Sequence, residues 1–185
     1  MATPSSFQTV TLGPKGPEVP ALGVGTWAWG DALFWQYGGA YGADDIRAAF
    51  NTSVSTGVNF FDTAEVYGLG KSEELIGQFM QQSDQTAVVA TKYMPVPWRF
   101  SAQSVADALT ASLKRLKLPA ITLYQVHWPE RNSNFFGKLG YQHQPDEQSI
   151  PVEETLDALN ELVDEGKIRT CCYLAVLPNV LALSS

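Results

Sequence analysis

The sequence predicts an α/β fold built as part of a (β/α)8 barrel, with a β-hairpin at its start. Along the 185 residues, short apolar runs alternate with amphipathic helix patterns, which is typical of βαβ units and a parallel sheet. The apolar runs are nearly continuous, as expected of strands that are buried on both faces. Neither a GxGxxG motif after the first strand nor a Walker A motif is present, which argues against doubly wound dinucleotide-binding and P-loop folds.

Each element follows from its local pattern. Alternating residues around a Gly/Pro turn in Gln8–Pro20 predict the hairpin. Apolar residues at helical spacing predict helices over 44–56, from about residue 72, from about residue 101 and over 151–165. The predicted parallel strands are Leu22–Trp27, Val58–Asp62, Thr86–Lys92, Ile121–His127 and a fifth from Lys167.

The number of units indicates how much of a barrel the chain holds. A closed barrel has eight βα units and about 250 residues, whereas the pattern here repeats about five times. We therefore expect residues 1–185 to form the amino-terminal part of a single domain. The outer strands of such an open sheet carry unpaired backbone groups beside apolar side chains, and we expect self-association through these edges.

The composition and the charge argue against several classes of function. Apolar residues make up 45% and charged residues 17%, which is ordinary for a globular protein. Twelve basic and 19 acidic residues give a net charge of −7, which argues against nucleic-acid and membrane-surface partners. The two cysteines, Cys171 and Cys172, are adjacent, so no disulfide framework and no metal site is predicted. The opening residues carry no leader pattern, which predicts a cytoplasmic location, or a plastid one in a photosynthetic eukaryote.

Four polar residues stand where the predicted strands end. Asp62 ends the second strand and Tyr67 follows five residues later, while Lys92 and His127 end the third and fourth strands. In a barrel of this kind, catalytic groups lie at the carboxyl ends of the strands or in the loops that follow. Any one of these residues alone is an ordinary strand-end residue, but together they form a proton-donor set.

The chemistry of the set is consistent with carbonyl reduction. A tyrosine hydroxyl ordinarily has a pKa of about 10, and a nearby ammonium such as that of Lys92 favours the phenolate. Asp62 can supply the counter-charge that a buried lysine needs, and His127 can orient a carbonyl oxygen. Tyr67 would then protonate that oxygen while a hydride reaches the carbon. No side chain supplies a hydride, so a nicotinamide cofactor is implied.

Six motifs stand in order along the chain: Leu22-Gly-Val-Gly-Thr-Trp27, Phe60-Phe-Asp-Thr-Ala-Glu-Val-Tyr-Gly68, Ala90-Thr-Lys92, Leu113-Lys-Arg-Leu116, Leu123-Tyr-Gln-Val-His-Trp128 and Glu165-Gly-Lys-Ile-Arg169. Over about residues 12–169 the chain resembles the aldo-keto reductase family. The loop after Trp128 resembles the Tas-like bacterial branch, and Trp98-Arg-Phe100 resembles a plant and cyanobacterial branch.

The resemblance implies an NADPH-dependent oxidoreductase that reduces a small carbonyl substrate, an aldehyde or a ketone, to an alcohol. It implies Tyr67 as the general acid, Lys92 and Asp62 as its tuning pair, and His127 as the residue that orients the substrate. The cofactor-binding residues that it implies are Gly25, Thr26, Trp27 and Asp62.

The chain departs from the family pattern after Arg169. The family continues with an apolar run that ends in Gly-Val-Ser-Asn, and its Ser-Asn pair holds the nicotinamide carboxamide. Leu174 and Ala175 stand at those positions here, so residues 170–185 are expected to be the divergent tail of a C-terminally truncated member. Two functions stay open: the NADPH-dependent reductase, and a non-catalytic remnant that acts as an interaction subunit.

Overall fold

The computed structural model describes residues 8–13, 16–83, 87–96, 99, 101, 103–128 and 151–173. Its centre is a parallel sheet with the strand order β3 (Gly23–Gly25), β4 (Phe60–Asp62), β5 (Val88–Tyr93), β6 (Ile121–Val126) and β7 (Ile168–Tyr173). The helices between these strands are α1 (Ala43–Ser55), the short 3-10 helix η1 (Tyr67–Gly70), α2 (Lys71–Gln81), α3 (Gln103–Leu116) and α4 (Val152–Asp164).

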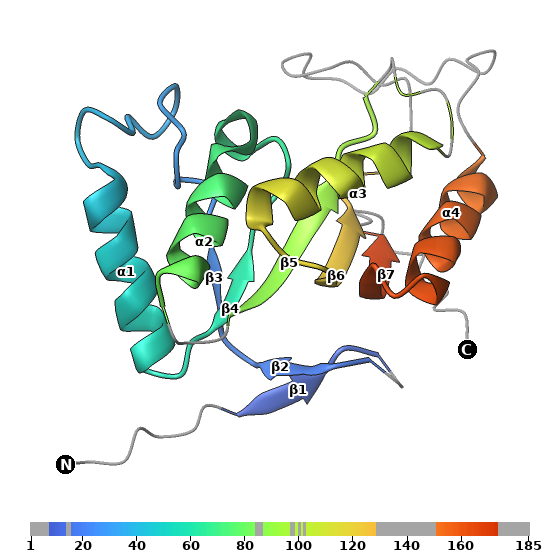
Figure 1. Cartoon of the computed structure of the whole chain (residues 1–185), viewed down its shortest axis with the longest axis horizontal. Helices are drawn as coiled ribbons and strands as arrows, with labels where there is room; N and C mark the ends of the chain where they lie inside the picture. Colours follow the sequence, from blue (N-terminus) through green and yellow to red (C-terminus); the bar gives the residue numbers. More distant parts are fainter. Residues whose placement is uncertain are drawn as a thin grey trace.

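The architecture confirms the predicted α/β fold. Strands neighbouring in sequence are neighbours in the sheet, as in the successive βα units of a barrel. The predicted hairpin is also present, as β1 (Thr9–Thr11) paired antiparallel with β2 (Glu18–Pro20). Figure 1 shows the hairpin lying across the end of the sheet at which the parallel strands begin. The loop after Trp128, residues 129–150, lies outside the described residues.

The two faces of the sheet have different roles because successive strand residues point to opposite faces. One face packs against the helices through a continuous apolar core, in which the ring of Phe61 on β4 stacks on Phe50 of α1 with centroids 4.9 Å apart. On the other face, Lys92, Gln125 and Cys172 are register partners across β5, β6 and β7. The fold therefore places a row of polar side chains on the face away from the helices.

The outer strands of the sheet are β3 and β7, and within the described ranges each pairs with a strand on one side only. Self-association through these edges stays a prediction. None of the helices in the described part of the chain is both long and apolar enough to cross a membrane.

A buried ion pair ties α2 to α3. The Glu73 carboxylate is fully buried, and it accepts hydrogen bonds of 2.6 Å from Arg115 Nε and 2.6 Å from Thr91 Oγ1 of β5. Arg115 also donates to Ser112 Oγ at 3.2 Å. Because a carboxylate without a partner is costly to bury, these contacts fix how α2 and α3 pack on the sheet.

Replacing Arg115 tests this contact. Arg115→Met leaves the Glu73 carboxylate buried without its cation, and we expect the free energy of unfolding to fall by about 3 kcal/mol. Arg47→Met, which breaks the exposed pair between Arg47 and Asp44, is the matched control and should cost less than about 1 kcal/mol. If urea titrations gave the two variants equal losses in the free energy of unfolding, the Glu73–Arg115 pair would not be what fixes the packing of α2 and α3.

Candidate active site

The four predicted catalytic residues lie at one edge of the sheet. Asp62 is the last residue of β4, Lys92 is the next-to-last residue of β5, and His127 directly follows β6. Tyr67 begins η1, the short helix after β4. The carboxyl ends of parallel strands meet at the same edge, so Asp62, Lys92 and His127 lie together at that edge.

The ammonium of Lys92 is the centre of the site. Its side chain is 4% exposed, and Nζ donates hydrogen bonds of 2.7 Å to Asp62 Oδ2 and 2.7 Å to the Thr63 carbonyl oxygen. Nζ also lies 3.3 Å from the Tyr67 hydroxyl oxygen. Three oxygen partners from the β4 end and the loop behind it thus stabilise one buried cation.

The Tyr67 ring contacts two other rings. It stacks on Trp27 with centroids 6.3 Å apart, and it meets His127 edge-on at 5.9 Å. Lys92 Nζ is 4.9 Å from the centroid of the Tyr67 ring. These contacts restrict the movement of the ring, so the hydroxyl stays beside the ammonium.

The turn after Tyr67 depends on a glycine. Gly68 has a φ of 56°, and a Cβ at this position would lie 2.6 Å from the Gly30 carbonyl oxygen. Leu69, the next residue, also has a φ of 56°, which is uncommon for a residue with a side chain. The strained turn directs the chain from β4 through Tyr67 into α2.

His127 is half-buried, and its backbone N–H donates to the Tyr93 carbonyl oxygen at 2.8 Å. Burial, followed by the positive charge of Lys92, lowers the pKa of the imidazole from its ordinary value of 6.5. The ring is therefore neutral at pH 7. Its Nδ1 is buried and has no hydrogen-bond partner among the described residues.

The predicted cofactor-binding residues at the end of β3 have different environments. Gly25 is exposed and is the register partner of Asp62, and Trp27 is half exposed. Thr26 is fully buried, and its hydroxyl contacts the Asp62 carbonyl oxygen at 3.0 Å and Ser72 Oγ at 2.8 Å. Contacts between this segment and a cofactor stay a prediction, and for Thr26 they would involve its backbone.

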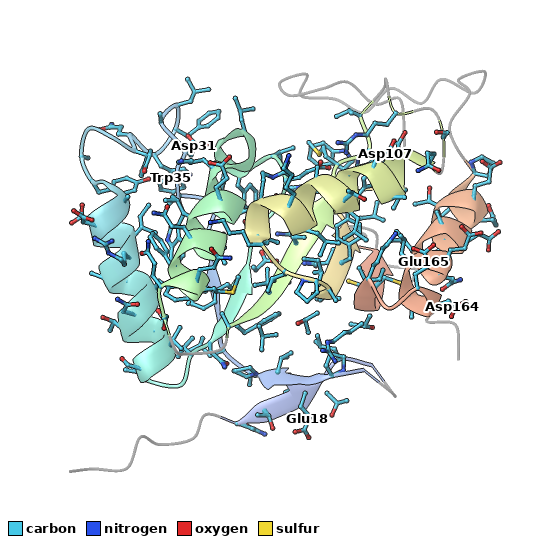
Figure 2. All side chains as sticks on the ribbon, in the orientation of Figure 1. Glu18, Asp31, Trp35, Asp107, Asp164 and Glu165 are labelled. Carbon is cyan, nitrogen blue, oxygen red and sulfur yellow. The ribbon has the colours of Figure 1, made fainter. Side chains whose placement is uncertain are left out.

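An aromatic cluster extends the site along the loop between β3 and α1. The Trp27 ring contacts Trp35 with centroids 5.7 Å apart and Phe34 at 6.4 Å, and all three side chains are exposed. Figure 2 shows Trp35 and Asp31 on this loop, at the end of the molecule opposite Glu18 of the hairpin. Apolar rings therefore border the edge of the sheet that carries Tyr67.

Two partners of the site were not predicted from the sequence. Gln125 of β6 donates from Nε2 to Asp62 Oδ1 at 3.0 Å. Gln125 and His127 are two residues apart, so strand alternation places both on one face. This spacing is the sequence signal that could have identified Gln125.

Glu65, the second of these partners, accepts hydrogen bonds from Met94 N at 2.6 Å and, through both carboxylate oxygens, from Arg99. This ion pair joins the loop that carries Tyr67 to the loop after β5, and its two partners are too far apart in sequence to be paired by inspection.

The lowered pKa of His127 sets the pH dependence of stability. The unfolded chain takes up a proton at this residue near pH 6.5, whereas the folded chain does so only at lower pH. The free energy of unfolding should therefore fall as the pH drops from 6.5 through the folded value. His127→Gln should remove this part of the slope. NMR titration of the ring protons, assigned with a His143→Gln variant, would contradict the account if His127 titrated at or above 6.5.

The chain matches known proteins over most of its length. The model of the aldo/keto reductase family matches residues 21–172. A pyridoxal reductase (chloroplastic) of Arabidopsis thaliana is 38% identical over 132 residues, covering 66% of this chain and 35% of that protein. Protein tas of Escherichia coli (strain K12) is 34% identical over 172 residues, covering 82% of this chain and 47% of that protein. The chain thus spans half or less of the length of these relatives.

Solved structures of aldo-keto reductases are also similar to this chain. An aldo-keto reductase from Klebsiella pneumoniae in complex with NADPH superposes with a TM-score of 0.63 at 29% identity, covering 84% of this chain and 45% of that one. A thermostable aldo-keto reductase, Tm1743, bound to the inhibitor epalrestat superposes with a TM-score of 0.68 at 30% identity, covering 90% and 53% of the two chains. The five parallel strands and the helices between them thus have the arrangement of part of a (β/α)8 barrel, and the chain belongs to the aldo/keto reductase family.

Proposed function

We propose that this chain reduces the carbonyl group of aldehydes or ketones to an alcohol with NADPH as the reductant. The observation that carries the proposal is the Tyr67 hydroxyl, 3.3 Å from the ammonium of Lys92, which is itself bound to Asp62. The family match supports an oxidoreductase. The complex of the Klebsiella pneumoniae relative with NADPH supports the choice of cofactor.

The residues at the carboxyl ends of β3 and β4 fit a nicotinamide cofactor. The donor set holds a hydroxyl proton and a cation but no group that can give up a hydride, so the chemistry needs one from outside. Gly25, at the end of β3, is exposed, and apart from its two chain neighbours no residue has an atom within 4 Å of where its Cβ would be. The Asp62 side chain is 40% exposed although it bonds Lys92. Gly25, Trp27 and the exposed part of Asp62 are the residues that would hold the cofactor beside Tyr67.

The chain's own residues supply the proton. Tyr67 donates its hydroxyl proton to the carbonyl oxygen, and the Lys92 ammonium stabilises the phenolate that remains. When bound, NADPH supplies the hydride that the carbonyl carbon receives. The neutral His127 ring orients the carbonyl oxygen through the nitrogen other than its buried Nδ1.

The surroundings of Tyr67 suit a substrate with an apolar body. The exposed rings of Trp27, Phe34 and Trp35 form one cluster next to the tyrosine. Beyond His127, the Trp128 ring lies with its centroid 5.2 Å from the histidine. Rings of this kind bind apolar and aromatic groups through buried area and stacking, which leaves the carbonyl oxygen to the polar residues.

Removing the hydroxyl of Tyr67 tests the proposal. Tyr67→Phe takes away the proton donor but little volume, so we expect kcat for reduction of an aromatic aldehyde to fall by about 10²–10⁴-fold. NADPH affinity, followed by fluorescence titration, should stay nearly constant. Tyr37→Phe makes the same chemical change at a tyrosine whose ring packs on Tyr41 and should leave kcat unchanged.

Two outcomes would overturn the proposed function. Unchanged turnover in Tyr67→Phe would show that another group donates the proton. A folded wild-type chain that neither binds NADPH nor consumes it with a panel of aldehydes and ketones would show that the chain is not a reductase, and would favour a non-catalytic interaction subunit.

A further inference from the structure

Gln125 is a buried amide that contacts the Asp62–Lys92 pair from the neighbouring strand. Gln125 as a whole residue is only 5% exposed. In the strand register, Gln125 of β6 is the partner of Lys92 on β5 and of Cys172 on β7. These three side chains therefore lie in one row on one face of the sheet, next to the carboxylate at the end of β4.

The two oxygens of the Asp62 carboxylate have different donors. Oδ2 accepts from Lys92 Nζ at 2.7 Å, and Oδ1 accepts from Gln125 Nε2 at 3.0 Å. Because the Asp62 side chain is 40% exposed, packing alone leaves it room to rotate toward water. The hydrogen bond from Gln125 to Oδ1 opposes that rotation and so keeps Oδ2 on the ammonium of Lys92.

The amide of Gln125 has a partner at its other end. Cys172 Sγ lies 3.9 Å from Gln125 Oε1 and donates to it. Burial and the neighbouring Cys171 raise the pKa of the Cys172 thiol to about 11, so the thiol keeps its proton at neutral pH. A thiol donor on Oε1 and a carboxylate acceptor at Nε2 both require the same orientation of the amide.

We propose that Gln125 is a positioning residue for carbonyl reduction, acting through the Asp62 carboxylate to hold the Lys92 ammonium beside the Tyr67 hydroxyl. This inference rests on the proposed function. Gln125 itself touches neither the tyrosine nor a reacting atom, so its loss should change how fast the bound substrate reacts. The effect should appear in kcat, with little change in KM for the carbonyl substrate.

Gln125→Glu makes the hydrogen bond depend on pH. A protonated glutamic acid has nearly the shape of glutamine and can donate its O–H to Asp62 Oδ1, whereas an ionised one repels that carboxylate. The titratable groups facing position 125 are Asp62 on β4, Lys92 on β5, Cys172 on β7 and His127 after β6. The kcat of the variant should match that of the wild type at low pH. At high pH the variant should lose the hydrogen bond to Asp62.

The experiment measures kcat from pH 6 to pH 9 for the wild type and three variants of the full chain. Relative to the wild type at each pH, kcat of Gln125→Glu should fall by about tenfold or more as the acid ionises, because the carboxylate that forms cannot donate to Asp62 and repels it. Gln125→Met, which cannot donate, should have a low kcat throughout the range. Gln82→Glu makes the same chemical change at an exposed position after α2 and should follow the wild type.

Unfolding of the same variants in urea separates a positioning role from a structural one. The free energy of unfolding of Gln125→Glu should fall with rising pH relative to that of the wild type, because the folded variant keeps a proton that the unfolded chain releases. A pH-independent difference would overturn the Gln125–Asp62 contact. A falling stability with kcat equal to that of the wild type at every pH would overturn the positioning role. An inactive wild type would overturn the proposed function itself, and the positioning role with it.

Discussion

The burial of one ammonium, that of Lys92, determines how the rest of the site is arranged. A lysine side chain that is 4% exposed needs several oxygen partners, because a buried charge without them is strongly unfavourable. The partners come from Asp62, the Thr63 carbonyl and the Tyr67 hydroxyl, all on the end of β4 or in the loop behind it. The cation therefore forces that loop against β5, and the same contact places a positive charge beside a potential acid.

The remaining structure supports this contact from outside. The Glu65–Arg99 pair joins the loop that carries Tyr67 to the loop after β5. The hydroxyl of Ser72, at the start of α2, lies 2.8 Å from Thr26 Oγ1 and 2.9 Å from Thr63 Oγ1, so the ends of β3 and β4 are joined at the first turn of the helix. A proton donor acts efficiently only when its geometry is set before the reaction, and these contacts set the geometry of the loop that carries Tyr67.

Local patterns were enough to predict the βα order, the hairpin and the strand ends that hold Asp62, Lys92 and His127, because alternation and helical spacing depend on near neighbours. Partners that depend on register or on distant loops could not be predicted in the same way. Gln125 faces Asp62 only because β4, β5 and β6 align as they do. The burial of the Thr26 hydroxyl depends on the position of α2, for which a strand-end pattern contains no information.

The central claim is that Lys92 and Asp62 form one coupled unit in the folded chain, and a double-mutant cycle measures this directly. The free energies of unfolding of Lys92→Met, Asp62→Asn and the double variant are compared with that of the wild type in urea. If the two side chains depend on each other, the double variant loses less stability than the sum of the single losses, by more than about 1 kcal/mol. Losses that add to within about 0.5 kcal/mol would contradict the account, because they would mean that the lysine is held by other groups.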